Sequence, residues 1–441
     1  MTTAVDHYVT AREAISLPGS GQGWLDALRG SGVSKLREDG FPTLSNENWR
    51  YTNIRPILRQ TFNPAPSARK ESGHEEFAGL ILPELHSHRI VFIDGHYARA
   101  LSSPDHLPAA ITVEPMATAV ACGRNGVKEW LGKCIPEDSS GFTALNTAFI
   151  EDGLYLHLAS DVHVQHPVEV VFFTTKTGGQ LVQPRNLFII GENSRVHIIE
   201  RYVSTGVDSH LTNSVTELVA ENSAVVEHTR LQEEGGRAFH VGGLFMRAKG
   251  NSHVISNNVA LGSMIARTDL TIALADEGAC CTLNGVYLGS GRQHIDNFTQ
   301  VDHQVPHCKS DEFYKGVLTD RARAVFYGRV IVHEGAQHTD AQQQNRNLLL
   351  SADAEVDTKP QLEIYADDVK CSHGATVGQL DESATYYLRT RGIDETTARS
   401  LLTWAFAADV INRISSTPVR NYVEGILGKK LFGVERLEEL V

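Results

Sequence analysis

The segment Leu187-Phe-Ile-Ile-Gly-Glu-Asn-Ser-Arg-Val-His-Ile-Ile199 decides how this 441-residue chain folds. It contains two apolar, β-branched runs joined by a short polar turn, a pattern typical of two strands with a tight connection. Similar units recur downstream, for example around Ala-Glu-Asn-Ser223 and Lys-Gly-Asn-Ser252. A strand–turn–strand unit that repeats along the chain indicates a solenoid.

The turns of these units recur at a nearly regular spacing. Successive turns are 29, 29, 27, 43 and 32 residues apart, at Ser194, Ser223, Ser252, Ala279, Ala322 and Ala354. No helical pattern separates the strands, so leucine-rich and ankyrin repeats do not fit, and a mainly β fold built as a parallel β-helix does. An antiparallel sandwich with evenly spaced strands is the alternative. The 43-residue step predicts a loop inserted near Gly291–Ser310.

Helical patterns flank the repeats on both sides. The sequence predicts an N-terminal mixed helical region over residues 1–150, a β-helix core over 151–385 and a C-terminal helical region over 386–441. Asp394 is expected to cap a helix over Ala398–Ile414. The apolar stripe expected on this helix is broadened by Trp404 and Phe406 and comprises Leu401, Leu402, Ala405, Ala408 and Ile411. Such helices either cap the solenoid or dock a partner helix or domain.

Composition narrows the class of protein. The net charge is −13, from 40 basic and 53 acidic residues, which argues against nucleic acid or an anionic membrane as the main partner. No apolar run approaches the length of a membrane span, and the N-terminus shows no signal-peptide core. The six cysteines follow neither a disulfide framework nor a zinc pattern, so we expect a reducing, cytoplasmic location.

Cys371 and His373 are the strongest candidates for metal chemistry. They are two residues apart in an alternating stretch, so on a strand both side chains leave by the same face, with α-carbons roughly 6.6 Å apart. A thiolate and an imidazole suit iron, zinc or copper. Two ligands do not complete a site, so others must come from elsewhere in the chain or from a second chain. The alternative is an inert pair, because free cysteine is commonly buried and histidine can be satisfied by a neighbour.

The sequence also bears on two other functions, carbohydrate chemistry and nucleotide hydrolysis. Glu355, Asp357 and Asp367 raise the possibility of a carbohydrate-active β-helix enzyme with paired carboxylates. Nucleotide-binding motifs are missing from the sequence, because the nearest match to a phosphate-binding loop has the wrong spacing. We therefore expect that no nucleotide binds this chain and that a partner hydrolyses any ATP the process consumes.

Several segments of the chain carry a family resemblance. The longest is Ala354–Gly378, which contains Cys-Ser-His-Gly374. Shorter ones are Asn-Glu-Asn-Trp-Arg-Tyr-Thr52, Val-Phe-Ile-Asp-Gly-His-Tyr97, Arg323–Phe326 with Gly328, and Arg389-x-Arg-Gly-Ile-Asp394. These segments closely resemble the SufB/SufD family of the SUF iron–sulfur cluster assembly machinery. The resemblance thus spans nearly the whole chain, and the length suits the SufD type better than the longer SufB type.

The resemblance implies a right-handed parallel β-helix between two helical regions. It also implies a scaffold without catalytic activity of its own, which pairs with a SufB-like paralogue, docks a SufC-like ATPase through its C-terminal helices and can form a homodimer when alone. By the same resemblance, His373 and, with less support, Cys371 contact a nascent iron–sulfur cluster shared with the partner. ATPase docking would fall on Leu401, Leu402, Trp404, Ala405 and Phe406. A purely structural partner that makes no cluster contact is the remaining alternative.

Overall fold

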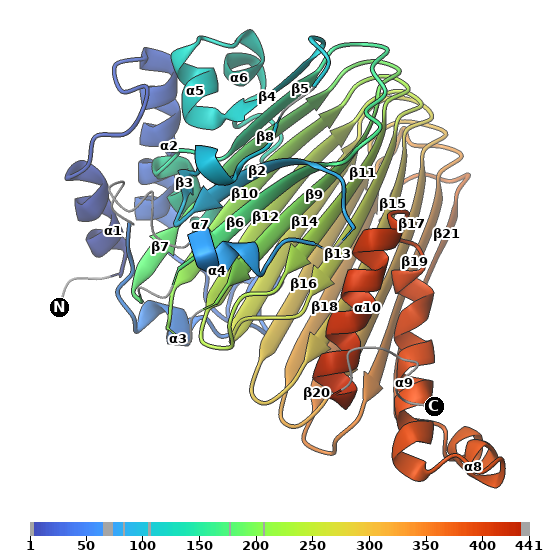
Figure 1. Ribbon diagram of the computed structural model, residues 1–441. Helices are drawn as coiled ribbons and strands as arrows, with labels where there is room; N and C mark the ends of the chain where they lie inside the picture. Colours follow the sequence, from blue (N-terminus) through green and yellow to red (C-terminus); the bar gives the residue numbers. More distant parts are fainter. Residues whose placement is uncertain are drawn as a thin grey trace.

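A computed structural model describes residues 4–64, 74–82, 84–104, 107–175, 178–205 and 208–433 of the chain. The predicted parallel β-helix between helical regions is confirmed (Figure 1). Its strands alternate between two sheets, so that each coil contributes one strand to each sheet, and the described residues make about eight coils. Neighbouring strands within each sheet of the solenoid are parallel.

The strands of the solenoid have the following bounds. The first sheet contains β5 (Leu154–Leu158), β8 (Arg185–Ile190), β10 (Leu211–Ala220), β12 (Phe239–Ala248), β14 (Ile265–Leu274), β16 (His294–His303), β18 (Arg323–Val332) and β20 (Glu355–Ile364). The second contains β6 (Val168–Thr174), β9 (Arg195–Ser204), β11 (Val225–Gln232), β13 (His253–Ala260), β15 (Cys280–Gly289), β17 (Lys309–Leu318), β19 (Asp340–Leu349) and β21 (Lys370–Gly378). Short β1 (Asn63–Pro64) and β7 (Gln180–Val182) pair with each other beside β10.

Stacking of like residues from coil to coil holds the solenoid together. One inner row is aligned in register across five coils and fully buried: Phe188, Leu218, Met246, Ile272 and Val301. Burying a side chain of this size stabilises a fold by about 1.5–3 kcal/mol, and every coil adds several. The repeat seen in the sequence is therefore the repeat of these buried rows.

The prediction of an inserted loop near Gly291–Ser310 is wrong. That stretch contains β16, which pairs with β14 and β18 along its whole length. Each coil has two polar turns of similar composition. Ala279 lies just before β15 of the second sheet, whereas Ala322 lies just before β18 of the first, so the 43-residue step spans one and a half regular coils.

The N-terminal residues cover the start of the solenoid and extend its sheets. β2 (His88–Ile93) pairs in parallel with β6, and β4 (Ile111–Pro115) pairs antiparallel with β5. β2 and β3 (His96–Tyr97) form the expected hairpin, in which Asp94 and Gly95 have φ of 50° and 86°. The helices of this region are α1 (Ala4–Glu13), α2 (Gly23–Asp39), η1 (Glu47–Trp49), α3 (Arg55–Leu58), α4 (His74–Ala78), η3 (Arg99–Leu101), α5 (Met116–Ala121), α6 (Asn125–Trp130) and α7 (Gly141–Ala148).

Three helices follow the last coil: α8 (Glu382–Thr390), α9 (Glu395–Ile411) and α10 (Thr417–Phe432). The predicted cap is confirmed, because the Asp394 carboxylate accepts a hydrogen bond from the backbone N–H of Thr397. α9 and α10 pack together, and α9 also packs on β15 and β17, whereas α8 projects away from the solenoid (Figure 1). The apolar stripe predicted for α9 is largely wrong, because the face buried against these neighbours carries Thr403, Ala407, Val410 and Ile411. Of the predicted stripe only Ile411 is buried, and Ala405 is exposed.

Candidate functional site

Cys371 and His373 lie on the last strand of the second sheet, at the open end of the solenoid. β21 pairs with β19 on one side, and among the described residues no strand lies on its other side. Cys371 is in register with Ala341, and His373 is in register with Gln343. Because Ala341 and Gln343 are both buried, their neighbours on β21 point to the inner face of the final coil. The two candidate ligands thus share one face.

The two side chains differ in exposure. His373 is exposed, whereas Cys371 is half-buried and packs against the apolar core. Burial raises the pKa of the Cys371 thiol above its usual value, although a hydrogen bond with the backbone of Ala341 opposes the shift. His373 is therefore the more accessible donor, and Cys371 needs a bound metal to favour its thiolate. Within the described part of the chain, no three His, Cys, Asp or Glu side chains are placed to hold a metal ion together.

The final coil exposes apolar side chains beside this pair. Ile364, Tyr365 and Val377 are 40%, 62% and 48% exposed. Ile364 and Val377 lie on β20 and β21, whose outer edges carry backbone N–H and C=O groups that no other described strand pairs. Such an edge is a template for pairing with a strand of another chain.

A buried polar layer lies directly beneath the last coil, and the sequence reasoning missed it. Glu312 on β17 and Gln343 on β19 are each 1% exposed and face one another in register. Nε2 of Gln343 donates a hydrogen bond to Oε2 of Glu312 at 2.6 Å. One signal was available in the sequence: Asp340-Ala-Gln-Gln-Gln-Asn-Arg-Asn347 is polar on both strand faces, which an apolar core does not explain.

Glu312 makes stability depend on pH. Burial raises the pKa of its carboxyl group to about 7, despite opposing hydrogen bonds that include that of Gln343. The folded protein then keeps Glu312 protonated where the unfolded chain has lost the proton, so this contribution to stability declines as pH rises from about 4.5 to 7.

We expect Glu312→Gln to remove this dependence. Between pH 5 and pH 8, the wild type should lose roughly 2–3 kcal/mol of unfolding free energy relative to the variant. Urea unfolding of both proteins at the two pH values measures the difference. Parallel pH profiles would contradict a carboxyl group that titrates near neutrality in the fold.

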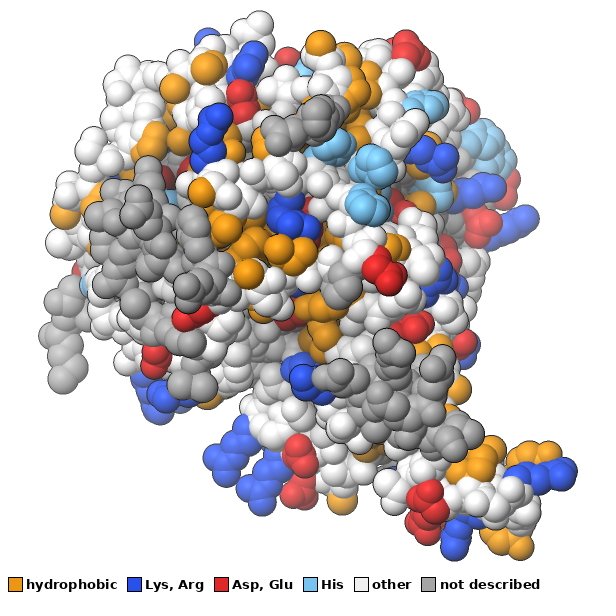
Figure 2. All heavy atoms as spheres, viewed as in Figure 1, with side chains coloured by type: hydrophobic (Ala, Val, Ile, Leu, Met, Phe, Trp, Pro, Cys, Tyr) orange, Lys and Arg blue, Asp and Glu red, His pale blue; other side chains and the backbone are white. Residues whose placement is uncertain are grey.

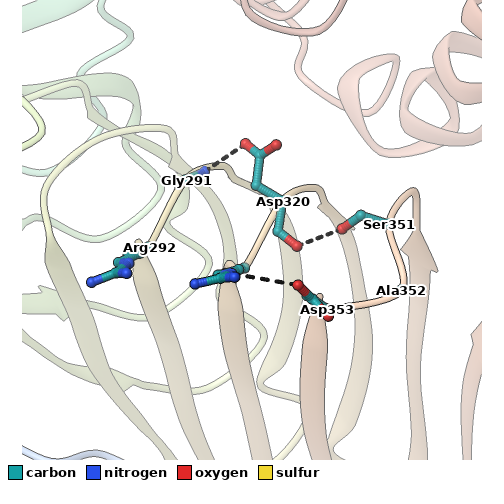
Figure 3. A pocket seen from close by; sticks show the side chains of 7 residues that line it. Gly291, Arg292, Asp320, Ser351, Ala352 and Asp353 are labelled. Carbon is teal, nitrogen blue, oxygen red and sulfur yellow. Dashed lines mark hydrogen bonds and ion pairs between the residues drawn. The ribbon is translucent and has the colours of Figure 1, made fainter.

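The carboxylates of the carbohydrate-enzyme alternative lie outside this layer. Glu355 is exposed and forms an ion pair with Arg323 at 2.9 Å. Asp357 is an exposed residue of β20. Partial burial of its carboxyl group and the charge of Glu355 raise the pKa of that group. Asp367 lies in the turn before β21. An open groove nearby has none of the three in its lining (Figure 3).

That groove lies on the turns that precede β16, β18 and β20. The backbone N–H of Gly291 donates to the carboxylate of Asp320, and the hydroxyl of Ser351 donates to the backbone carbonyl of Asp320 (Figure 3). Arg321 forms an ion pair with Asp353 at 3.4 Å. Most charged groups of this groove pair with one another, so the groove does not offer several free side chains that point toward one bound molecule.

The expected ATPase-docking residues lie on α9. Ala405 is exposed, and the other four, Leu401, Leu402, Trp404 and Phe406, are half-buried. Trp404 and Phe406 pack against the apolar cluster between the helices and the solenoid, and the Phe406 ring lies 4.5 Å from Nζ of Lys315. The sequence reasoning did not single out Tyr386 and Tyr387 on α8, which are 68% and 58% exposed. Hydrophobic side chains are visible on this projection at the lower right of Figure 2.

Two family models together match almost the whole chain. The model described as "SUF system FeS cluster assembly, SufBD core domain" matches residues 172–406, and "SufBD protein N-terminal region" matches residues 2–170. The boundary between them falls within the first coil, at β6.

Three similar proteins match over most of their length, and two of them are named for iron–sulfur cluster assembly. A SufBD family iron–sulfur cluster assembly protein of Synechocystis is 31% identical, over 93% of this chain and 92% of its own length. The iron–sulfur cluster assembly protein SufD of Escherichia coli is 29% identical over 92% of each chain. The chloroplastic protein ABCI7 of Arabidopsis thaliana is 26% identical over 97% of this chain and 90% of its own length. These names point to a cluster-assembly component rather than to a carbohydrate enzyme, and the chain belongs to the SufB/SufD family, in which it is SufD-like.

Proposed function

We propose that this chain is a scaffold subunit that pairs with a SufB-like paralogue through its last coil and helps to hold a nascent iron–sulfur cluster there. The observation that carries the proposal is the placement of His373 and Cys371 on one face of β21, a strand whose outer edge pairs with no other described strand. A neighbouring chain that adds its own strand to β21 would bring further ligands to the same edge. The cluster is cargo, shared by the two chains.

Co-expression with a SufB-like and a SufC-like chain tests the assembly. Native mass spectrometry of the purified complex should detect this chain bound to both partners. A mass that corresponds to this chain alone, with both partners expressed and folded, would contradict the proposal. When the chain is produced alone, we expect the same edge to pair with its own copy, so that a homodimer forms in place of the heterodimer.

A proline at the edge tests the pairing mode. The backbone N–H of Lys370 donates to the carbonyl oxygen of Thr339, just before β19, so alternation directs the N–H of Ala375 to the free edge. Ala375→Pro therefore removes one edge donor without breaking the bonds to β19. We expect at least a tenfold weaker affinity for the paralogue, the value of about one hydrogen bond, measured by titration calorimetry. Ala375→Ser keeps the N–H and should bind as the wild type does; equal binding of both variants would contradict pairing through this edge.

We further propose that a SufC-like ATPase docks on the exposed face of α9, and that this chain binds no nucleotide itself. Ala405 tests the docking cleanly, because it is exposed and makes no core contact. Ala405→Asp should weaken co-purification of the ATPase at least tenfold while unfolding stays unchanged. Trp404→Asp should do the same but should also destabilise the chain, since Trp404 packs on the solenoid. Undiminished co-purification with Ala405→Asp would contradict docking at this face.

The proposed location is the cytoplasm. All six cysteines are free. None of the helices described in the structure combines the length and the apolar character that crossing a membrane requires. Because the Arabidopsis relative is named as chloroplastic, the compartment differs among similar proteins. Cell fractionation followed by immunoblotting tests the location, and recovery in the membrane pellet would contradict it.

A further inference from the structure

One row of inner side chains leads from the open end of the solenoid into its interior. His373, Gln343 and Glu312 are in register on β21, β19 and β17, so their side chains follow one another along the same inner face. Exposure falls sharply along this row, because His373 is exposed whereas Gln343 and Glu312 are each 1% exposed. The exposed imidazole is thus backed by two buried polar groups.

The amide of Gln343 has a defined orientation. Its Nε2 atom donates to Oε2 of Glu312 at 2.6 Å, so the amide nitrogen faces the carboxyl group and the carbonyl oxygen faces away from it. The carbonyl oxygen Oε1 of Gln343 is therefore the group left to accept another hydrogen bond. Among the described residues this buried oxygen has no hydrogen-bond partner. Leaving a buried acceptor unpaired is unfavourable, so a donor is expected to reach it.

The opposite sheet leaves room for this amide at Gly328. A Cβ atom added at Gly328 would lie 2.3 Å from Nε2 and 2.8 Å from Cδ of Gln343. Any larger residue there would displace the amide. Gln343 is therefore held between Glu312 on its own sheet and the bare backbone of Gly328 across the solenoid.

The adjacent donor in this row is the imidazole of His373, one strand closer to the open end. A histidine that binds a metal through one ring nitrogen nearly always donates the N–H of the other to a fixed acceptor, which selects the tautomer and the ring orientation. Among the described residues neither ring nitrogen of His373 makes a hydrogen bond, to Gln343 or to any other group, so both nitrogens are available. Gln343 offers an acceptor in the adjacent register position.

We propose that Gln343, clamped by Glu312, accepts a hydrogen bond from one ring N–H of His373 and so presents the other ring nitrogen to the iron of the nascent cluster. This inference rests on the proposed role of His373. Gln343 and Glu312 are positioning residues that touch no iron themselves. Their removal should weaken iron binding without removing a ligand.

Gln343→Met tests the proposal, because methionine keeps most of the side-chain volume and lacks the acceptor. In the anaerobic complex we expect Fe²⁺ to bind 10–100-fold more weakly, the usual range for loss of such a partner. Gly328→Ala, which pushes the same amide aside, should have a similar effect. Neither substitution should have any additional effect in a His373→Ala background. The matched control is Gln232→Met, since Gln232 is also buried in the solenoid and donates to a buried carboxylate, that of Glu234 at 3.0 Å; it should leave iron binding unchanged.

A second measurement needs no metal. In the iron-free protein with ¹⁵N-labelled histidine, the signals absent from His373→Ala report the tautomer of this ring. We expect one predominant tautomer in the wild type and a mixture in Gln343→Met, and a spectrum unchanged by Gln343→Met would overturn the inference. If His373→Ala lowers iron content but Gln343→Met binds Fe²⁺ as the wild type does, the positioning role alone fails. If His373→Ala retains its iron, the proposed function of the site fails as well.

Discussion

Replacing His373 by alanine is expected to lower the iron and acid-labile sulfide of the anaerobically purified complex at least tenfold. The reason is that His373 is the exposed donor of the pair on β21, whereas Cys371 is half-buried and has a raised thiol pKa. Loss of the imidazole leaves one poorly ionised donor at the edge, which cannot replace it. Iron and sulfide per complex are measured by colorimetric assay, and the cluster by its visible absorption.

A matched histidine provides the control. His338 is also exposed, lies in the turn before β19 and pairs with Asp368 at 2.9 Å, but it is not on the inner face of the last coil. His338→Ala should therefore retain the iron and sulfide of the wild type. Cys371→Ser should produce a loss no larger than that of His373→Ala. Undiminished iron and sulfide in His373→Ala would remove this residue from the mechanism.

Replacing Arg267 by methionine is expected to cost about 3–5 kcal/mol of unfolding free energy. Arg267 is 1% exposed and pairs with Asp296 and, at 2.6 Å, with Asp269. Its guanidinium carbon also lies 3.8 Å from the centre of the Trp49 ring. The substitution leaves the buried carboxylate of Asp296 and the partly buried carboxylate of Asp269 without their cation, and it loosens the segment that carries Trp49 from the solenoid. Guanidinium chloride unfolding at pH 8 measures the loss.

An exposed pair shows what burial contributes. Arg323 pairs with Glu355 at 2.9 Å, but the side chains are 63% and 60% exposed. Solvent screens such a pair, so Arg323→Met should cost less than about 1 kcal/mol. Equal losses in Arg267→Met and Arg323→Met would contradict the importance of the buried cation. The loss in Arg267→Met should also be smaller at pH 5, where the stranded carboxylates can take up protons.

The solenoid could be predicted from the sequence because its stability is local and repetitive. Each coil buries the same inner positions against the coil before it, so rows such as that of Phe188 and Leu218 produce a periodic apolar pattern. The prediction of an inserted loop between Ala279 and Ala322 failed, since the two polar turns of one coil are chemically alike. Only the pairing of strands distinguishes them.

The site was predictable in part for the same reason. Alternation along a strand is a local property, so the shared face of Cys371 and His373 followed from their spacing. The buried face of α9 did not, because this helix is apolar around much of its circumference and its packing against β15, β17 and α10 selects the face. Ala405 was therefore expected in the apolar stripe and is exposed.

The sequence by itself determined the repeat, the helical ends and the two candidate ligands, since each depends on residues close together in the chain. Only the tertiary structure decided that His373 lies exposed on the inner face of the last coil and that Glu312 and Gln343 lie behind it. These three residues are about thirty positions apart, and they meet because successive coils stack in register. Contact across coils depends on that register, which no local pattern specifies.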